Sequence, residues 1–263
     1  TYYLKTSRTN IALYEVQNML KEAQKEDDKT GLSRCYNIMS QIYTIKRFDS
    51  MAFEWRLKEI ELTEKYNIEN YNISQTYAQI ANYYISQKKQ KEALRAVEKA
   101  ISTANSSTQQ ISAKLEYVNY YSKFGDFQAA EKILKECQIA FEQDKRLESI
   151  KKRLYNIECL YYQQTRQYQK ALEAAEMQEK EEHRLSESIL SSSHYRTQGE
   201  IYQKMGNMNM AVKYLQMYIN TDDSLKIANE QVASSEFATL LNVEKLNAEK
   251  KELMLQAQEK ELH

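Results

Sequence analysis

The sequence predicts an all-α fold, a solenoid of about six helical hairpins followed by a long C-terminal helix. Two observations carry this prediction: the 263-residue chain has no proline and only four glycines, and a Tyr–Ala pair recurs along it at one fixed spacing. A sheet protein of this length would need many more turn-forming residues. A pattern that returns about every 40 residues is typical of arrays whose units pack on their neighbours.

In the repeated pattern a Tyr stands nine residues before an Ala. The pairs are Tyr3/Ala12, Tyr43/Ala52, Tyr84/Ala93, Tyr121/Ala130, Tyr162/Ala171 and Tyr202/Ala211. Successive tyrosines lie 40, 41, 37, 41 and 40 residues apart, yet the distance within a pair never changes. The fixed distance therefore belongs to one local structure that every unit shares.

Each unit reads as two helices joined by a short turn. Small and apolar residues recur at helical spacing before the Tyr, as at Ala81 and Tyr84, and again from the Ala onward, as at Ala93, Val97 and Ala100. We expect the Tyr of the first helix to be mostly buried on the Ala of the second, because a larger residue there would hold the helices apart.

Three of these tyrosines are the second member of a doublet: Tyr83-Tyr84, Tyr120-Tyr121 and Tyr161-Tyr162. We expect the second Tyr of each doublet to lie in the core. The first is expected to pack between neighbouring units with its hydroxyl at the surface.

The spacing resembles the tetratricopeptide repeat (TPR). The fourth unit matches with Val118, Tyr121, Gly125, Ala130, Leu134 and Cys137, and the sixth with Gly199, Tyr202, Gly206, Ala211, Leu215 and Tyr218. The resemblance covers about residues 1–222 and implies a right-handed α-α superhelix. The sequence lacks the proline that usually closes each repeat, and its period is about 40 rather than 34. We expect the added residues to lengthen each helix by up to one turn at the end far from the hairpin turn.

The pattern divides the chain into an array, residues 1–222, and a C-terminal capping and connector helix, residues 223–263. The predicted repeats are 1–30 (truncated), 31–71, 72–107, 108–148, 149–188 and 189–222. Asp222, Asp223 or Ser224 is expected to cap the C-terminal helix at its start.

Composition and motifs argue against catalysis, cofactors and nucleic acid. Lys plus Arg equal Asp plus Glu at 37 each, which removes an electrostatic basis for binding nucleic acid. The four glycines are isolated, so no phosphate-binding loop can be built from them. Cys35, Cys137 and Cys159 show no CxxC spacing, and the three histidines are scattered, so we expect no metal site and no catalytic group.

The TPR resemblance implies a concave face lined by the first helices, which binds a peptide or an extended protein segment. The residues that map to this face are mostly amides, which can both donate to and accept from a peptide backbone. In peptide-binding members of the family, Asn at the positions of Asn82 and Asn119 does this. The candidate ligand-binding residues are Asn37, Gln41, Gln79, Asn82, Asn119, Lys123, Arg196, Glu200 and Lys204. Nearby lining positions are Thr44, Gln75, Ser86, Ser112, Glu116, Arg153, Asn156, Gln163, Gln164 and Gln203.

The C-terminal helix carries two apolar series at seven-residue spacing. They are Leu225, Val232, Leu246 and Leu253, and Leu241, Ala248, Leu255 and Leu262. We expect its first half, with Leu225, Val232 and Phe237, to dock on the exposed last edge of the array. Its second half is expected to meet a second copy of the chain as a weak homodimer.

Long repeats followed by a charged helix resemble the sensor regions of Bacteroidetes-type membrane signalling proteins, whose output is a histidine kinase or a DNA-binding module. This resemblance implies a ligand-sensing array on the periplasmic side of the inner membrane, joined to the membrane through a segment beyond His263. The alternative is a cytoplasmic scaffold or a peptide-pheromone-type receptor adaptor, and three cysteines without a pairing pattern favour that compartment.

Overall fold

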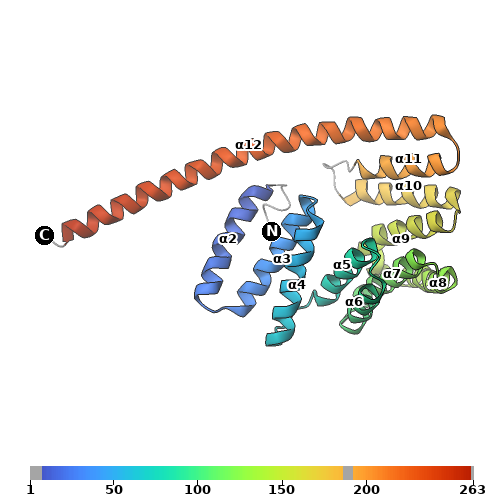
Figure 1. Ribbon diagram of the computed structural model, residues 1–263, viewed down its shortest axis with the longest axis horizontal. Coiled ribbons are helices and arrows are strands. Elements are labelled where there is room, and N and C mark those ends of the chain that lie inside the picture. The colour runs from blue at the N-terminus through green and yellow to red at the C-terminus, as the bar shows by residue number, and fades with distance from the viewer. Residues whose placement is uncertain (1–7, 186–191, 262–263) are drawn as a thin grey trace. The chain divides into compact units, whose positions relative to one another are not determined.

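The computed structural model describes residues 8–185 and 192–261, with side chains described for residues 8–181 and 192–254. The described chain is all-helical and has the α-α superhelix architecture predicted from the repeats (Figure 1). The first helices of the hairpins are α3 (Lys29–Ile45), α5 (Ile73–Ser86), α7 (Ser107–Phe124), α9 (Lys151–Gln164) and α11 (Ser193–Lys204). The second helices are α2 (Thr9–Lys25), α4 (Asp49–Tyr66), α6 (Gln90–Ser102), α8 (Phe127–Gln143), α10 (Tyr168–Leu185) and α12 (Met208–Glu261).

The turn inside each described hairpin has one backbone conformation, and it explains the fixed nine-residue spacing. The Tyr carbonyl accepts from the N–H five residues on, at 2.8–3.0 Å in the five turns that follow Tyr43, Tyr84, Tyr121, Tyr162 and Tyr202. The residue four positions after each Tyr has a left-handed backbone conformation with positive φ; these residues are Arg47, Lys88, Gly125, Arg166 and Gly206. The backbone carbonyl of the residue after that one accepts from the N–H of the repeated Ala at 2.9–3.1 Å. This is the first hydrogen bond of the second helix. This is a Schellman ending followed directly by a new helix start.

The repeated alanines are buried. Ala52, Ala93, Ala130, Ala171 and Ala211 are between 0% and 3% exposed. Ala130, for example, joins Leu134 and Cys137 in one core cluster with Leu115 and Val118 of the preceding helix. Tyr3, the partner of Ala12, lies outside the described residues.

The prediction for the tyrosine doublets is wrong: Tyr83 and Tyr84 are both half-buried, and in the other two doublets the order is reversed. Tyr121 and Tyr162 pack against the clusters that contain Ala130 and Ala171, but both are only half-buried. Their first members, Tyr120 and Tyr161, are the buried ones at 5% exposure. The second Tyr instead offers a ring face to its surroundings, as where Lys170 Nζ lies 5.5 Å from the ring centroid of Tyr162.

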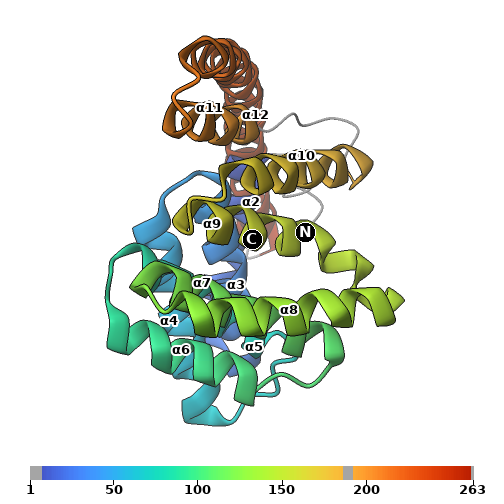
Figure 2. The same cartoon turned by 90° about the vertical axis from the view of Figure 1, so that its right-hand side faces the viewer.

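The chain forms two compact units. One contains residues up to Trp55 together with Ser224 onward, and the other spans Arg56–Asp223. The core of the first unit lies between α2 and α3 and contains Ala12, Val16, Cys35, Met39 and Ile42. In the second unit, hairpins α5–α6, α7–α8 and α9–α10 pack through their first helices: α7 contacts both α5 and α9 (Figure 2). The division into the six predicted repeats stays a prediction.

Helix α12 corrects the expected start of the C-terminal helix. It runs without a break from Met208 to Glu261, so Asp222, Asp223 and Ser224 lie inside it rather than at its start. Asp222 instead accepts from Ser192 Oγ at 3.0 Å. None of the described helices is long and apolar enough to span a membrane.

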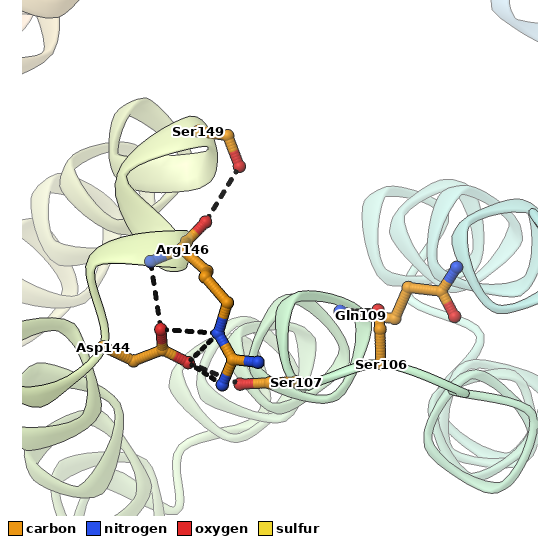
Figure 3. A network of polar contacts seen from close by, with 6 residues as sticks. All are labelled: Ser106, Ser107, Gln109, Asp144, Arg146 and Ser149. Atoms are coloured by element: carbon orange, nitrogen blue, oxygen red, sulfur yellow. Dashed lines mark hydrogen bonds and ion pairs between the residues drawn. The ribbon is translucent and has the colours of Figure 1, made fainter.

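Part of the added repeat length lies in connections rather than in longer helices. One connection is residues 67–72, and another contains a 3₁₀ helix, η1 (Lys145–Ile150). Asp144 organises the second one, as Figure 3 shows: its carboxylate accepts from the Arg146 N–H at 3.0 Å, from Arg146 Nη2 at 2.8 Å and from Ser107 Oγ at 3.1 Å. These donors hold the pKa of the Asp144 carboxyl well below its usual range.

Candidate functional site: a polar face on the first helices

The two asparagines singled out from the sequence face one another across neighbouring repeats. Asn82 lies on α5 and Asn119 on α7, each two residues before the repeated Tyr. Asn119 Nδ2 donates to Asn82 Oδ1 at 2.7 Å, and both side chains are half-buried. The pair leaves an amide nitrogen on Asn82 and an amide oxygen on Asn119, a donor and an acceptor of the kind that binds a peptide backbone.

The polar contacts continue from α7 to α9 through an ion pair. Glu116, 1% exposed, accepts from Arg153 Nη2, and Asn119 Nδ2 lies 3.5 Å from the same carboxylate. The sequence placed Glu116 and Arg153 on the lining of the face, whereas the structure buries Glu116 between helices. A buried carboxylate needs such partners because desolvation of a bare charge is costly.

Gln79, three residues before Asn82 on α5, connects this face to the preceding helix α4. Its Oε1 accepts from Arg56 Nε of α4 at 2.6 Å, and Arg56 is itself only 8% exposed. Arg56 was not among the predicted site residues. The only sequence signal is its place four residues after the repeated Ala52, where the helix face turns inward.

The predicted basic residues divide into two groups. Arg196 on α11 donates to Glu200 Oε1 at 2.8 Å, and Arg153 is paired with Glu116, so both charges are matched locally. Lys204 donates to the neutral Gln163 at 3.0 Å, linking α11 to α9, and Lys123 at the end of α7 is exposed. Among the predicted residues, Lys123 and Lys204 are therefore the cations whose charge is not neutralised by a carboxylate and is available to a ligand.

Asn37 and Gln41, the predicted residues of the first unit, lie one turn apart on α3. Gln41 Nε2 donates to Asn37 Oδ1 at 2.5 Å, and the Gln41 side chain is exposed. Both side chains thus interact within their own helix. That these residues and those of the second unit serve one ligand stays a prediction.

The described cysteines and acidic residues provide no reactive thiol and no metal site. Burial raises the pKa of the Cys137 thiol to about 11 and also raises the pKa values of Cys35 and Cys159, so these thiols are protonated and unreactive near neutral pH. The described side chains include no cluster of His, Cys, Asp and Glu that could hold a metal ion.

Comparisons with known proteins support the fold. No family model and no curated protein matches the sequence. Among solved structures, a Rap protein complexed with competence and sporulation factor is similar with a TM-score of 0.58 and 17% identity, over 94% of this chain and 73% of that one. The TPR-like repeats of a putative kinesin light chain from Podosopora anserina are similar with a TM-score of 0.51 and 13% identity, over 71% and 92%. PilW, a type IV pilus biogenesis factor, is similar with a TM-score of 0.50 and 16% identity, over 83% and 89%.

These likenesses define a class. The chain has the fold of TPR-repeat scaffolds, which generally bind other proteins and carry no catalytic site of their own. The polar face on its first helices has the chemistry that such a scaffold needs.

Proposed function

We propose that the chain binds a peptide or an extended protein segment along the polar face of α5, α7 and α9. The observation that carries this proposal is the continuous series of side-chain contacts from Asn82 through Asn119 and Glu116 to Arg153. It crosses three successive first helices and fixes the positions of an amide donor and an amide acceptor. Fixed donors and acceptors bind an extended backbone with little loss of side-chain freedom.

The net charge of the face favours a ligand with a carboxylate. Arg153 and Arg196 are each paired with a carboxylate, whereas Lys123 and Lys204 are paired with none among the residues that the structure describes. An acidic side chain or a C-terminal carboxylate of the ligand would match these lysines. A library of unstructured peptides, presented to the whole chain, tests this directly. Binders should be acidic and should slow hydrogen exchange in α5, α7 and α9; protection confined to α6 and α8 would contradict the site.

We further propose that the array is the ligand-sensing region of a bacterial membrane-anchored signalling protein on the periplasmic side of the inner membrane. The support is helix α12, a 54-residue element that extends about 80 Å at 1.5 Å per residue. A helix without a hinge moves as one lever with the hairpin at its base. Two glycines inserted after Asn242 should then interrupt signalling in the full-length protein while ligand binding persists. Unchanged signalling would exclude the lever.

The far half of α12 supports a weak homodimer. Leu246 and Leu253 lie seven residues apart and are 63% and 65% exposed, surrounded by charges of both signs. Leu255 and Leu262 of the same predicted surface lie outside the described side chains. Sedimentation at rising concentration should show a monomer–dimer equilibrium that L246K/L253K shifts toward monomer, whereas an equilibrium indifferent to these changes would move the contact elsewhere.

The alternative is a cytoplasmic receptor adaptor or scaffold, favoured by the similarity to the Rap protein complexed with competence and sporulation factor. The two proposals share the binding face and differ in the segment that comes after α12. An apolar stretch of about 20 residues encoded after position 263 supports the sensor. A polar continuation supports the adaptor.

A further inference from the structure

A carboxylate from α12 caps the first described helix. Glu236 Oε1 accepts from the backbone N–H of Asn10 at 3.1 Å and of Ile11 at 3.3 Å, and Glu236 Oε2 accepts from Asn10 Nδ2 at 2.8 Å. Glu236 is 3% exposed, although the helix around it is mostly charged and solvent-accessible. All of these atoms belong to the first compact unit.

Helix α2 has no cap of its own. Its N-cap residue is Arg8, whose side chain makes no capping hydrogen bond, as is also the case at α5, α6, α9 and α11, whereas α3, α7 and α8 are capped by Asp28, Ser106 and Asp126. The first N–H groups of a helix are unsatisfied and carry partial positive charge, so a carboxylate is their favoured partner. Lys46 Nζ, at the end of α3, donates to Asn10 Oδ1 at 2.6 Å and so orients the Asn10 amide toward Glu236.

Only one face of α12 is covered around Glu236. Val232, Ala233, Leu240 and Val243 are half-buried at the spacing of one helix face, and every residue from Glu244 to Met254 is exposed. The prediction that Phe237 docks is wrong, because it is 64% exposed and lies beside Glu236 on the outer surface. Within its unit, this segment contacts the N-terminal end of α2.

We propose that the packed pair of helices α2 and α3 carries a docking site for a helix that presents a carboxylate to the N-terminal end of α2. Its resident occupant is the 225–243 segment of α12, and Glu236 is the latch. The apolar contribution is small, since the covered residues are half-buried, so the hydrogen bonds of one carboxylate decide whether the segment is held. A contact of that size can be shifted by a modest change in binding energy elsewhere.

The latch is independent of peptide binding by the polar face. Its release would free the 225–243 segment from the N-terminal end of α2. Failure of the latch leaves the proposed binding face unaffected, because the residues of the two features are different.

Hydrogen exchange of the whole chain tests the latch. Compared with the parent, E236Q and E236A should speed exchange of the Asn10 and Ile11 amides and of the 225–243 segment by about 3- to 30-fold, the range of lost helix caps. E244Q, an exposed Glu two turns further along α12, is the matched control and should change nothing. Exchange in α7 should stay parental in every variant. Parental exchange of α2 and residues 225–243 in E236A would overturn the latch.

Swapping the carboxylate and the amide between positions 10 and 236 provides a second test. N10D places two carboxylates together and should release the segment, although Asp near a helix N-terminus by itself favours the helix. N10D/E236Q restores a donor opposite an acceptor and should return exchange in 225–243 toward the parental rate. If the double variant exchanges as fast as N10D, the side chains do not meet and the proposal fails.

Discussion

Asn119 Nδ2 donates to Asn82 Oδ1 across 2.7 Å, and the same Asn119 stands beside the buried Glu116–Arg153 pair. Asn119 and Glu116 together therefore connect α7 to the first helices before and after it, α5 and α9. The candidate binding face is also part of the packing between repeats, which means that stability and binding must be measured separately in every variant.

The Glu116–Arg153 pair should be strongly asymmetric to mutation. R153A leaves a 1% exposed carboxylate without its cation and should lower the free energy of unfolding by about 3–5 kcal/mol. E116L/R153M, which removes both charges, should be nearly neutral. The control is R146A, whose exposed pair with Asp144 should cost no more than about 1 kcal/mol. Urea denaturation measures all three, and a double variant as unstable as R153A would contradict the account.

Replacement by glycine should stabilise the protein at the left-handed positions of the hairpin turns. Lys88 and Arg166 have φ values of 57° and 60°, where a side chain is strained. K88G and R166G should each raise the free energy of unfolding by about 0.5–1 kcal/mol. K132G, in the interior of α8, should lower it by about 1 kcal/mol. A loss of stability in both turn variants would show that the left-handed conformation is not adopted there.

The buried member of the Tyr120–Tyr121 doublet should dominate its energetics. Y120A should destabilise the chain by about 3–5 kcal/mol and Y121A by distinctly less, because only Tyr120 is fully buried. A130L should cost about 1–3 kcal/mol by forcing the hairpin helices apart. Thermal melts rank the three variants. If Y121A were less stable than Y120A, Tyr121 would be the more important core residue, as the sequence suggests.

Acid stability should depend on Asp144. Its pKa in the folded chain is lowered by Arg146, by the backbone and by Ser107, so its stabilisation is present above the ordinary Asp value and lost as pH falls below it. The melting temperature of the parent should therefore fall between about pH 5 and pH 2, and that of D144N should fall less over the same range. Equal slopes for the two proteins would exclude this role. Glu64, whose pKa is lowered by Tyr77 and Lys99, keeps part of the slope in D144N.

The hairpins could be predicted from the sequence because the Tyr–Ala spacing is set by a single local turn. The left-handed residues could not, since Arg47, Lys88 and Arg166 stand where glycine is expected. The sequence also could not show which Tyr of each doublet is the buried one, because adjacent residues of a helix lie 100° apart and both are tyrosine. Asn82 and Asn119 followed from the resemblance to the tetratricopeptide repeat, whose peptide-binding members carry Asn at these positions. The Glu236 contact joins residues 226 positions apart, and the missing cap at Arg8 does not reveal it, because α5, α6, α9 and α11 also begin without a side-chain cap.

The binding face itself is tested most directly by N82A/N119A. With an acidic peptide selected by the whole chain, titration calorimetry should show at least about 10-fold weaker binding, the loss expected when hydrogen bonds worth about 1.4 kcal/mol in total are removed. Q128A, an exposed amide on the second helix α8, is the control and should bind as the parent does. The melting temperature should stay parental in Q128A and fall only slightly in N82A/N119A, which loses one hydrogen bond between repeats. Parental affinity in N82A/N119A would contradict the account and move the site away from the first helices.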